Sequence, residues 1–155
     1  MTQAEQFLKK VSLFEKCSSD DLQRLALNMR WLAYRKGDTI LFQGMISHQM
    51  FFILTGRAAV FTRKDRETRR VADLEAGSYF GEISLLTNKA ATATIKADEE
   101  DTQIYVLERD AVIEALSRNP AAMADITAKV QERNQGRLDA FRAPEAEAET
   151  TAVPA

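Results

Sequence analysis

The sequence predicts a mainly β domain with flanking helices: a β-roll (jelly roll) with N-terminal helices before it and two C-terminal helices after it. Three observations lead to this fold class. Apolar residues recur at helical spacing near both ends, short apolar or alternating runs fill the stretch from Trp31 to Glu108, and turn residues separate most of these runs. The 155 residues, 45% of them hydrophobic, suffice to bury the core of one domain.

Two short helices are expected before the sheet. Residues 5–11 place Phe7, Leu8 and Val11 on one face at helical spacing. Ser19 is the expected N-cap of a second helix, and two aspartates in its first turn favour the positive end of the helix dipole. The apolar residues of this second helix are Leu22, Leu25, Ala26 and Met29.

The central stretch contains the expected strands. Glycines at positions 37, 44, 56 and 77 suit tight or left-handed turns between them. Short strands with turn signals at such intervals are typical of an all-β sandwich or barrel. The runs cover residues 31–34, 39–42, 50–54, 58–62, 70–74, 93–97 and 102–107.

Helical spacing returns after Leu107. One amphipathic segment covers residues 111–116, and Asn119-Pro120 ends it and places Pro120 in the first turn of the next helix. That helix carries Met123, Ile126 and Val130 and then becomes polar. We therefore expect a folded domain over residues 1–137 and a disordered tail or linker over residues 138–155.

Composition argues against several classes of protein. The single histidine, His48, lies in a polar loop segment, and no residues at catalytic or metal-ligand spacing accompany it, so we expect no enzyme activity, no metal and no cofactor. The single cysteine, Cys17, cannot form an internal disulfide and is compatible with a reducing compartment.

Nucleic acid and membrane are also not expected as partners. The formal net charge is -2, and about twenty acidic, alanine-rich residues follow Asn134, where a DNA-binding helix-turn-helix would be needed. The chain has no apolar run near the ~20 residues of a membrane helix and no signal-peptide core. We expect a cytoplasmic protein, or the cytosolic part of a membrane protein.

The most specific motif is the run Gly77-Ser78-Tyr79-Phe80-Gly81-Glu82-Ile83-Ser84-Leu85-Leu86, which is followed by Ala91-Thr92-Ala93-Thr94-Ile95. Both segments resemble the phosphate-binding cassette of the cyclic nucleotide-binding domain family. With the order of helices and strands and the glycine spacing, the resemblance covers roughly residues 5–135. It implies the same β-roll and a bound cyclic nucleotide, cAMP or cGMP.

The resemblance also implies roles for individual residues. Gly81 lets the backbone approach the phosphate, and the short helix 82–86 offers N–H groups, among them that of Ser84. Glu82 would accept the ribose hydroxyl and Thr92 would bond the phosphate, while residues 123–137 would form a lid. Family correspondence places Val60 and Val71 at the base, although ordinary core positions explain them equally well. The expected ligand-binding residues are Phe80, Gly81, Glu82, Ile83, Ser84, Ala91, Thr92, Val60 and Val71.

Position 91 departs from the family pattern. The family carries an arginine there, and this chain has Ala91, so the phosphate lacks its counter-charge and Glu82 lacks a cation that holds it. Lys89 is close in sequence but is expected to remain solvated. One charge-assisted hydrogen bond contributes about 1.5–3 kcal/mol, so we expect affinity to be lower by about one to two decades. The alanine at position 91 is compatible with natural divergence and equally with an introduced arginine-to-alanine substitution.

Two functions therefore remain open. The first is a regulatory domain that binds cAMP or cGMP with weakened affinity and acts as the cytosolic sensor of a channel or other effector. The second is a degenerate domain of the same fold that serves as a protein-interaction or structural module without nucleotide. The sequence leaves the choice between adenine and guanine, the effector and the oligomeric state open.

Overall fold

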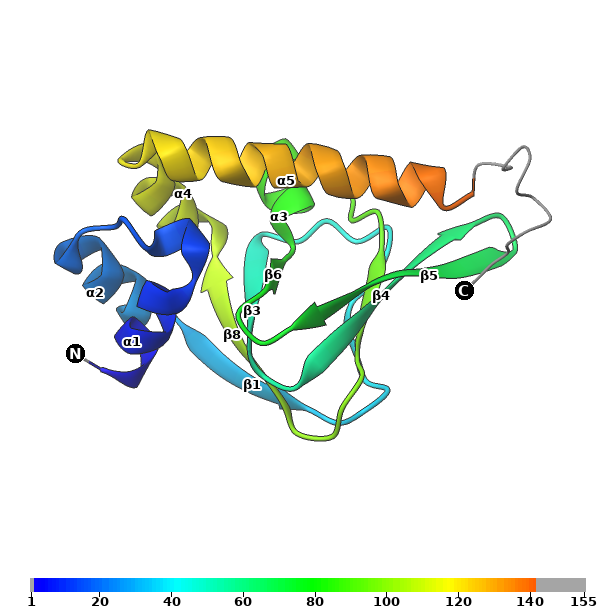
Figure 1. The fold of residues 1–155 in the computed structure, drawn as a ribbon, viewed down its shortest axis with the longest axis horizontal. Coiled ribbons are helices and arrows are strands. Elements are labelled where there is room, and N and C mark those ends of the chain that lie inside the picture. Colours follow the sequence, from blue (N-terminus) through cyan, green and yellow to red (C-terminus); the bar gives the residue numbers. More distant parts are fainter. Residues whose placement is uncertain (1, 142–155) are drawn as a thin grey trace.

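The computed structural model describes residues 2–141 and has the expected β-roll (Figure 1). Helices α1 and α2 lie at one end of the molecule, and the last helix, α5, runs along the roll (Figure 1). The helices are α1 (Gln3–Lys10), η1 (Ser12–Phe14, a 3-10 turn), α2 (Ser19–Leu27), α3 (Glu82–Thr87), α4 (Arg109–Ser117) and α5 (Pro120–Asp139).

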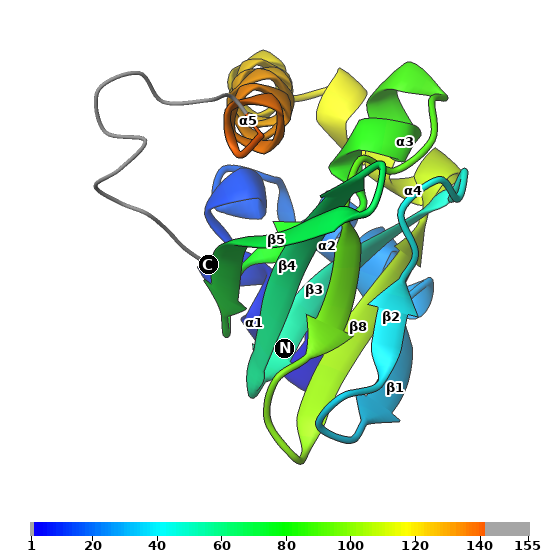
Figure 2. The same cartoon turned by 90° about the vertical axis from the view of Figure 1, so that its right-hand side faces the viewer.

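Eight strands form two four-stranded sheets whose pairs are all antiparallel. The order in one sheet is β1-β8-β3-β6 and in the other β2-β7-β4-β5, so strands distant in sequence pair in both (Figure 2). The strands are β1 (Arg30–Tyr34), β2 (Thr39–Leu41), β3 (Gln49–Thr55), β4 (Arg57–Lys64), β5 (Glu67–Glu75), β6 (Tyr79–Phe80), β7 (Thr94–Ala97) and β8 (Thr102–Glu108).

The core has two parts that share strand β3. Met50 and Phe52 pack in a cluster with the helices, whereas Phe51 and Ile53 pack in a second cluster inside the roll. This division follows from the strand geometry, because successive side chains point to opposite faces of a sheet. The first sheet is therefore covered on one face by helices and on the other by the second sheet.

The observed elements differ from the sequence prediction at several places. Helix α1 ends at Lys10 and α2 ends at Leu27, so Val11 and Met29 lie just outside the helices predicted to carry them. The N-cap of α2 is Ser18, whose hydroxyl accepts from the Asp21 N–H, and not Ser19. The two-residue strand β6 is too short for an alternating pattern to reveal it. Helix α5 ends at Asp139, past the boundary expected at 137, because no proline interrupts the chain before Pro144. The rest of the expected tail, 142–155, lies outside the described residues.

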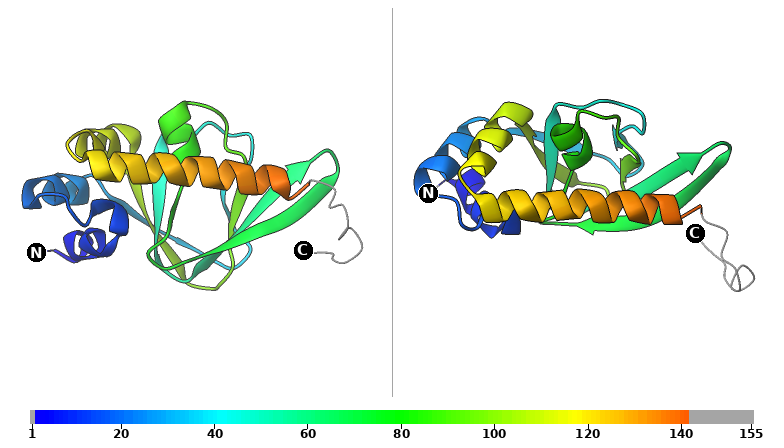
Figure 3. Two further views of the ribbon diagram at one scale, coloured as in Figure 1. Left: turned by 45° about the horizontal axis from the view of Figure 1, so that its top comes forward. Right: turned by 90° about the horizontal axis from the view of Figure 1, so that it is seen from above.

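Helix α5 begins as the sequence predicts and lies over the site. The Asn119 side chain accepts from the Ala122 N–H, and Pro120 occupies the first turn. From there α5 passes beside α3 and reaches the β4–β5 hairpin (Figure 3). In the described part of the chain, no helix has both the length and the apolar composition of a membrane span.

Candidate functional site

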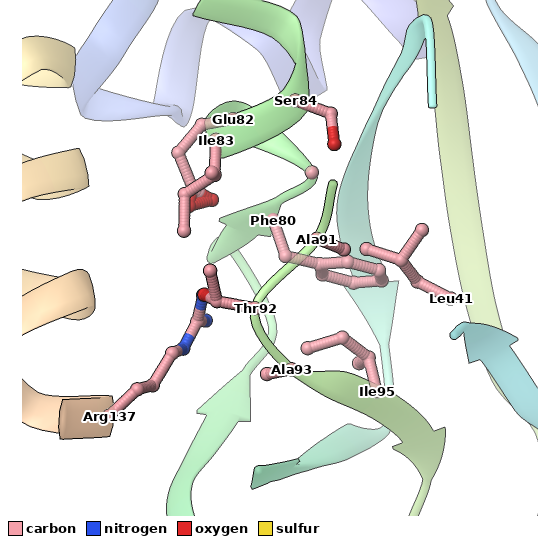
Figure 4. Close-up of a pocket in the computed structure, with 11 residues that line it drawn as sticks. Leu41, Phe80, Glu82, Ile83, Ser84, Ala91, Thr92, Ala93, Ile95 and Arg137 are labelled. Carbon is pink, nitrogen blue, oxygen red and sulfur yellow. The ribbon is translucent and has the colours of Figure 1, made fainter. Parts of the chain in front are cut away.

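A small cavity gathers most of the residues that the motif singles out. It lies between α3, the segment before β7 and the C-terminal part of α5 (Figure 4). Seven of the nine expected ligand-binding residues line it, namely Phe80, Gly81, Glu82, Ile83, Ser84, Ala91 and Thr92. The other lining residues are Leu41, Ala93, Ile95 and Arg137.

Gly81 fixes the start of α3 at this cavity. Its φ of 91° lies in the left-handed region, and a Cβ there would come within 2.8 Å of the Gln49 carbonyl oxygen. Only glycine combines this conformation with so close an approach of two backbones. At the other end of α3, Asn88 is also left-handed, and the Ser84 hydroxyl donates to the Lys89 carbonyl at 2.7 Å.

The segment that carries Ala91 and Thr92 is held by hydrogen bonds from both sides. The Ala91 N–H donates to the Met45 carbonyl, and the Ala91 carbonyl accepts from the Gly44 N–H, both at 2.8 Å. The buried Thr62 hydroxyl donates to the Thr92 carbonyl at 2.9 Å. Strand β4 and the β2–β3 loop therefore set the position of Thr92 in the cavity wall.

Glu82 is almost completely buried and forms a salt bridge with Arg133 of α5. One guanidinium nitrogen, Nη1, lies 2.7 Å from Oε1 and 2.9 Å from Oε2 of Glu82, and it also donates to the Tyr79 carbonyl. The side chains of Glu82 and Arg133 are 2% and 15% exposed. The guanidinium lies 5.3 Å from the Tyr79 ring centre, and burial raises the pKa of Tyr79 to about 12. The motif predicts a Glu82 without a nearby cation, because position 91 is alanine. In the structure, Arg133 of α5 is the cation beside Glu82.

A second arginine of α5 reaches the same cavity. Arg137 donates through Nη1 to the Thr92 hydroxyl at 2.7 Å (Figure 4). Burial lowers the pKa of the Arg137 guanidinium; the charge of Glu82 opposes this shift and that of Arg133 adds to it. Because Arg133 neutralises Glu82, the guanidinium of Arg137 leaves the cavity with a net positive charge.

The cavity is nearly filled by its own side chains. Its free volume is about 10 Å³, which is close to the least that holds one water molecule. A larger groove of about 610 Å³ adjoins it and shares Ala91, Thr92 and Arg137 with it. Grooves of this size are in the range that binds small organic ligands.

The comparisons with known proteins agree with this geometry. A family model described as "Cyclic nucleotide-binding domain" matches residues 31–119, more than half of the chain. The chain belongs to this family. A rod photoreceptor cyclic nucleotide-gated channel subunit alpha from Gallus gallus is 34% identical over 128 residues, which cover 79% of this chain but 19% of the channel subunit. The chain thus spans about a fifth of that relative.

Solved structures of the family share the fold. The regulatory domain of Toxoplasma gondii PKA, solved with cAMP, has a TM-score of 0.75 at 21% identity and aligns over 83% of this chain and 49% of that one. The regulatory subunit of a cAMP-independent protein kinase A from Trypanosoma brucei has a TM-score of 0.66 at 24% identity, over 75% and 45%. At these identities the likeness concerns the fold alone.

Two residues that the family correspondence indicated do not line either cavity. Val60 is buried in the cluster inside the roll, and Val71 is half-buried against the same cluster. A contact of these valines with a base stays a prediction. Lys89 and His48 are exposed. Within residues 2–141, no group of His, Cys, Asp or Glu side chains is arranged to hold a metal ion.

The two arginines of α5 are the functional candidates that the sequence analysis missed. In the sequence they belong to the polar end of the helix. Their spacing did contain a signal, since Arg133 and Arg137 follow the buried Ile126 and Val130 at intervals of three and four residues. Such intervals keep residues on one face of a helix. The face of α5 that buries Ile126 and Val130 therefore carries Arg133 and Arg137 further along, beside the cavity.

Proposed function

We propose that this chain is a regulatory domain that binds a 3′,5′-cyclic nucleotide. The observation that carries the proposal is the single cavity that combines seven cassette residues with a net positive charge from α5. A cyclic phosphate carries one negative charge, and backbone N–H groups and a guanidinium are suitable partners for it. In this proposal Gly81, Ser84 and Thr92 face the phosphate and Glu82 faces the ribose.

The ligand cannot enter the cavity as the structure has it, because about 10 Å³ is far too little for a nucleotide. Movement of α5 would open the site, since α5 contributes Arg133 and Arg137. The adjoining groove, which shares Thr92 and Arg137, offers room for the remainder of the nucleotide. Contact of the base with Val60 and Val71 belongs to the same proposal.

We infer that Ala91 stands at the arginine position of the cassette and that affinity is therefore lower than in a chain with arginine there. Ala91 lies in the cavity wall, so a longer side chain at this position would reach the proposed phosphate. The choice between cAMP and cGMP is left to the experiment below.

The effector is a further part of the proposal. The relative from Gallus gallus is a channel subunit in which a segment of this kind is about a fifth of the chain. A role as the cytosolic sensor of a channel or another effector would match that arrangement. Ligand binding would act on the effector through α5, the helix that lies over the cavity.

A specific observation also supports the second function, a protein-interaction or structural module that binds no nucleotide. The cavity is nearly filled by side chains of the chain itself, Arg137 among them, and one structural neighbour is described as cAMP-independent. A domain that retains the fold as a protein-interaction or structural module would have no need to open this site.

Isothermal titration of cAMP and cGMP separates the two functions. We expect the parent chain to bind at least one of them and the variant Ala91→Arg to bind it more tightly. The control is Ala128→Arg, which adds the same charge at an exposed position of α5 and should leave affinity within about twofold. Absence of heat with both nucleotides for both the parent and Ala91→Arg would support the structural module instead.

A further inference from the structure

Arg137 differs from the other arginine of the site in its partners. Arg133 is neutralised by Glu82, whereas Arg137 forms no salt bridge among residues 2–141 and has the Thr92 hydroxyl as its partner there. A guanidinium offers five N–H donors in a fixed fork. Most of the hydrogen-bonding capacity of Arg137 is therefore available to a further acceptor in the cavity or the groove.

The position of Arg137 is unfavourable for a cation without a counter-ion. Its guanidinium is half-buried, and burial is the main cause that lowers its pKa; the charge of Glu82 raises the pKa, and the like charge of Arg133 lowers it. An anion between Arg137 and Thr92 would compensate for the hydration that the guanidinium loses on burial. The structure thus contains a cation whose surroundings favour an anionic ligand.

Arg137 also lies where such a ligand has access. Its side chain forms part of the wall of both the filled cavity and the open groove, as do Ala91 and Thr92. The Thr92 hydroxyl accepts from Arg137 and donates to the Asn134 side chain at 3.3 Å. A phosphate oxygen in this place can accept from the hydroxyl and from the guanidinium together.

We propose that Arg137 supplies the cation of the phosphate site, from helix α5, in place of the arginine that is absent at Ala91. This inference rests on the proposed function. It adds a consequence for regulation: the phosphate would bridge Thr92 on the roll and Arg137 on α5, so charge recognition itself draws the helix to the roll. An arginine at position 91 would instead hold the phosphate on the roll alone.

A double-mutant cycle tests whether Arg137 has the role that an arginine at position 91 would have. The four chains are the parent, Arg137→Gln, Ala91→Arg and the double variant, each titrated with cAMP and cGMP by calorimetry at one salt concentration. We expect Arg137→Gln to weaken binding about ten- to hundredfold, the effect of one charge-assisted contact. Ala91→Arg should gain less than tenfold in the parent, where Arg137 repels it, and about ten- to hundredfold in the Arg137→Gln background.

Two further variants define the role of Arg137. Arg137→Lys keeps the charge without the fork, so it should bind between the parent and Arg137→Gln. Lys129→Gln removes an equal charge from the same helix, at a half-exposed side chain that does not line the cavity or the groove. This variant should leave affinity within about twofold. Thermal unfolding of each variant checks that it is folded; Arg137→Lys carries the test if Arg137→Gln is not.

The outcomes distinguish this inference from the proposed function. If the parent and Ala91→Arg both bind neither nucleotide, the proposed function fails. If the parent binds while Arg137→Gln and Arg137→Lys bind equally well, the function stands and the inference is wrong. A gain from Ala91→Arg that is the same with and without Arg137 would also overturn it, because two cations that serve the same phosphate cannot act independently.

Discussion

The pair Glu82–Arg133 links the roll to α5 through two almost buried charges. Each ion loses its hydration on folding and is compensated by the other, and the Tyr79 carbonyl takes a further hydrogen bond from Arg133. Removing one member of such a pair is costly because the remaining charge stays buried without a partner. The motif around Gly81 indicates Glu82. Its partner Arg133 lies 51 residues further along the chain, so the sequence does not reveal the pair.

We expect Arg133→Gln and Glu82→Gln each to lower the free energy of unfolding by about 3 kcal/mol. Arg133→Gln should have the larger effect, because Glu82 is the more buried of the two. The double variant should recover most of the loss, since neither charge remains. Urea denaturation at pH 7 measures all four chains.

The matched control is the exposed pair Lys129–Glu132 on the same helix, at 3.8 Å. Its coupling energy should be below about 1 kcal/mol, as for other surface ion pairs. A coupling for Glu82–Arg133 as small as that of the control would contradict the role assigned to the buried pair.

Helix α5 is held differently along its length. Its first half contributes Ala122 and Ile126 to the core cluster of the helices, whereas its second half contacts the roll through Arg133, Asn134 and Arg137. Apolar burial anchors the first half, and polar contacts that a ligand can replace hold the second. Asn119-Pro120 separates α5 from α4.

Saturating cyclic nucleotide should therefore increase the hydrogen-exchange protection of α5, most strongly over residues 131–139, and of the short helix α3. The reason is that the ligand adds contacts only where α5 and α3 face the site. Helix α2, which lies at the opposite end of the molecule from the C-terminal part of α5 (Figure 1), is the internal reference and should not change. Unchanged protection over residues 120–137 in a chain that binds nucleotide would exclude the role of α5 as a lid.

At the scale of the whole molecule, the two core clusters share strands β3, β6 and β8. Met50 and Phe52 of β3 pack with the helices, while Phe51 and Ile53 pack inside the roll. Loss of β3 from its sheet would expose both clusters at once. The roll and the described helices should therefore unfold as one cooperative unit.

Trp31 provides a probe of the roll that is independent of the helices. It is the only tryptophan, it lies on β1, and its indole N–H donates to Gln103 of β8. In a urea titration, Trp31 fluorescence and far-UV circular dichroism at the helical minimum should give the same midpoint. Phe52→Ala should lower the free energy of unfolding by about 3–5 kcal/mol, and both midpoints should fall together. Separate midpoints would mean that the helices fold apart from the roll.

Local pattern in the sequence determined the fold class, seven of the eight strands, the helix break at Asn119-Pro120 and the cassette residues around Gly81. These features depend on neighbours within a few residues: alternation, helical spacing, turn chemistry and the need for glycine at one left-handed position. The family resemblance added the expected ligand and the roles of the cassette residues, and the structure and the family match confirmed the fold.

Tertiary structure decided which cations enter the cavity and how far it is filled. The spacing of Arg133 and Arg137 shows that they share a helix face, but not what that face meets. Both arginines oppose Glu82 and Thr92 only because α5 folds back over α3 and the segment before β7. Electrostatic partners are set by distance in space, and in this fold more than 40 residues separate each arginine from the side chain that it holds.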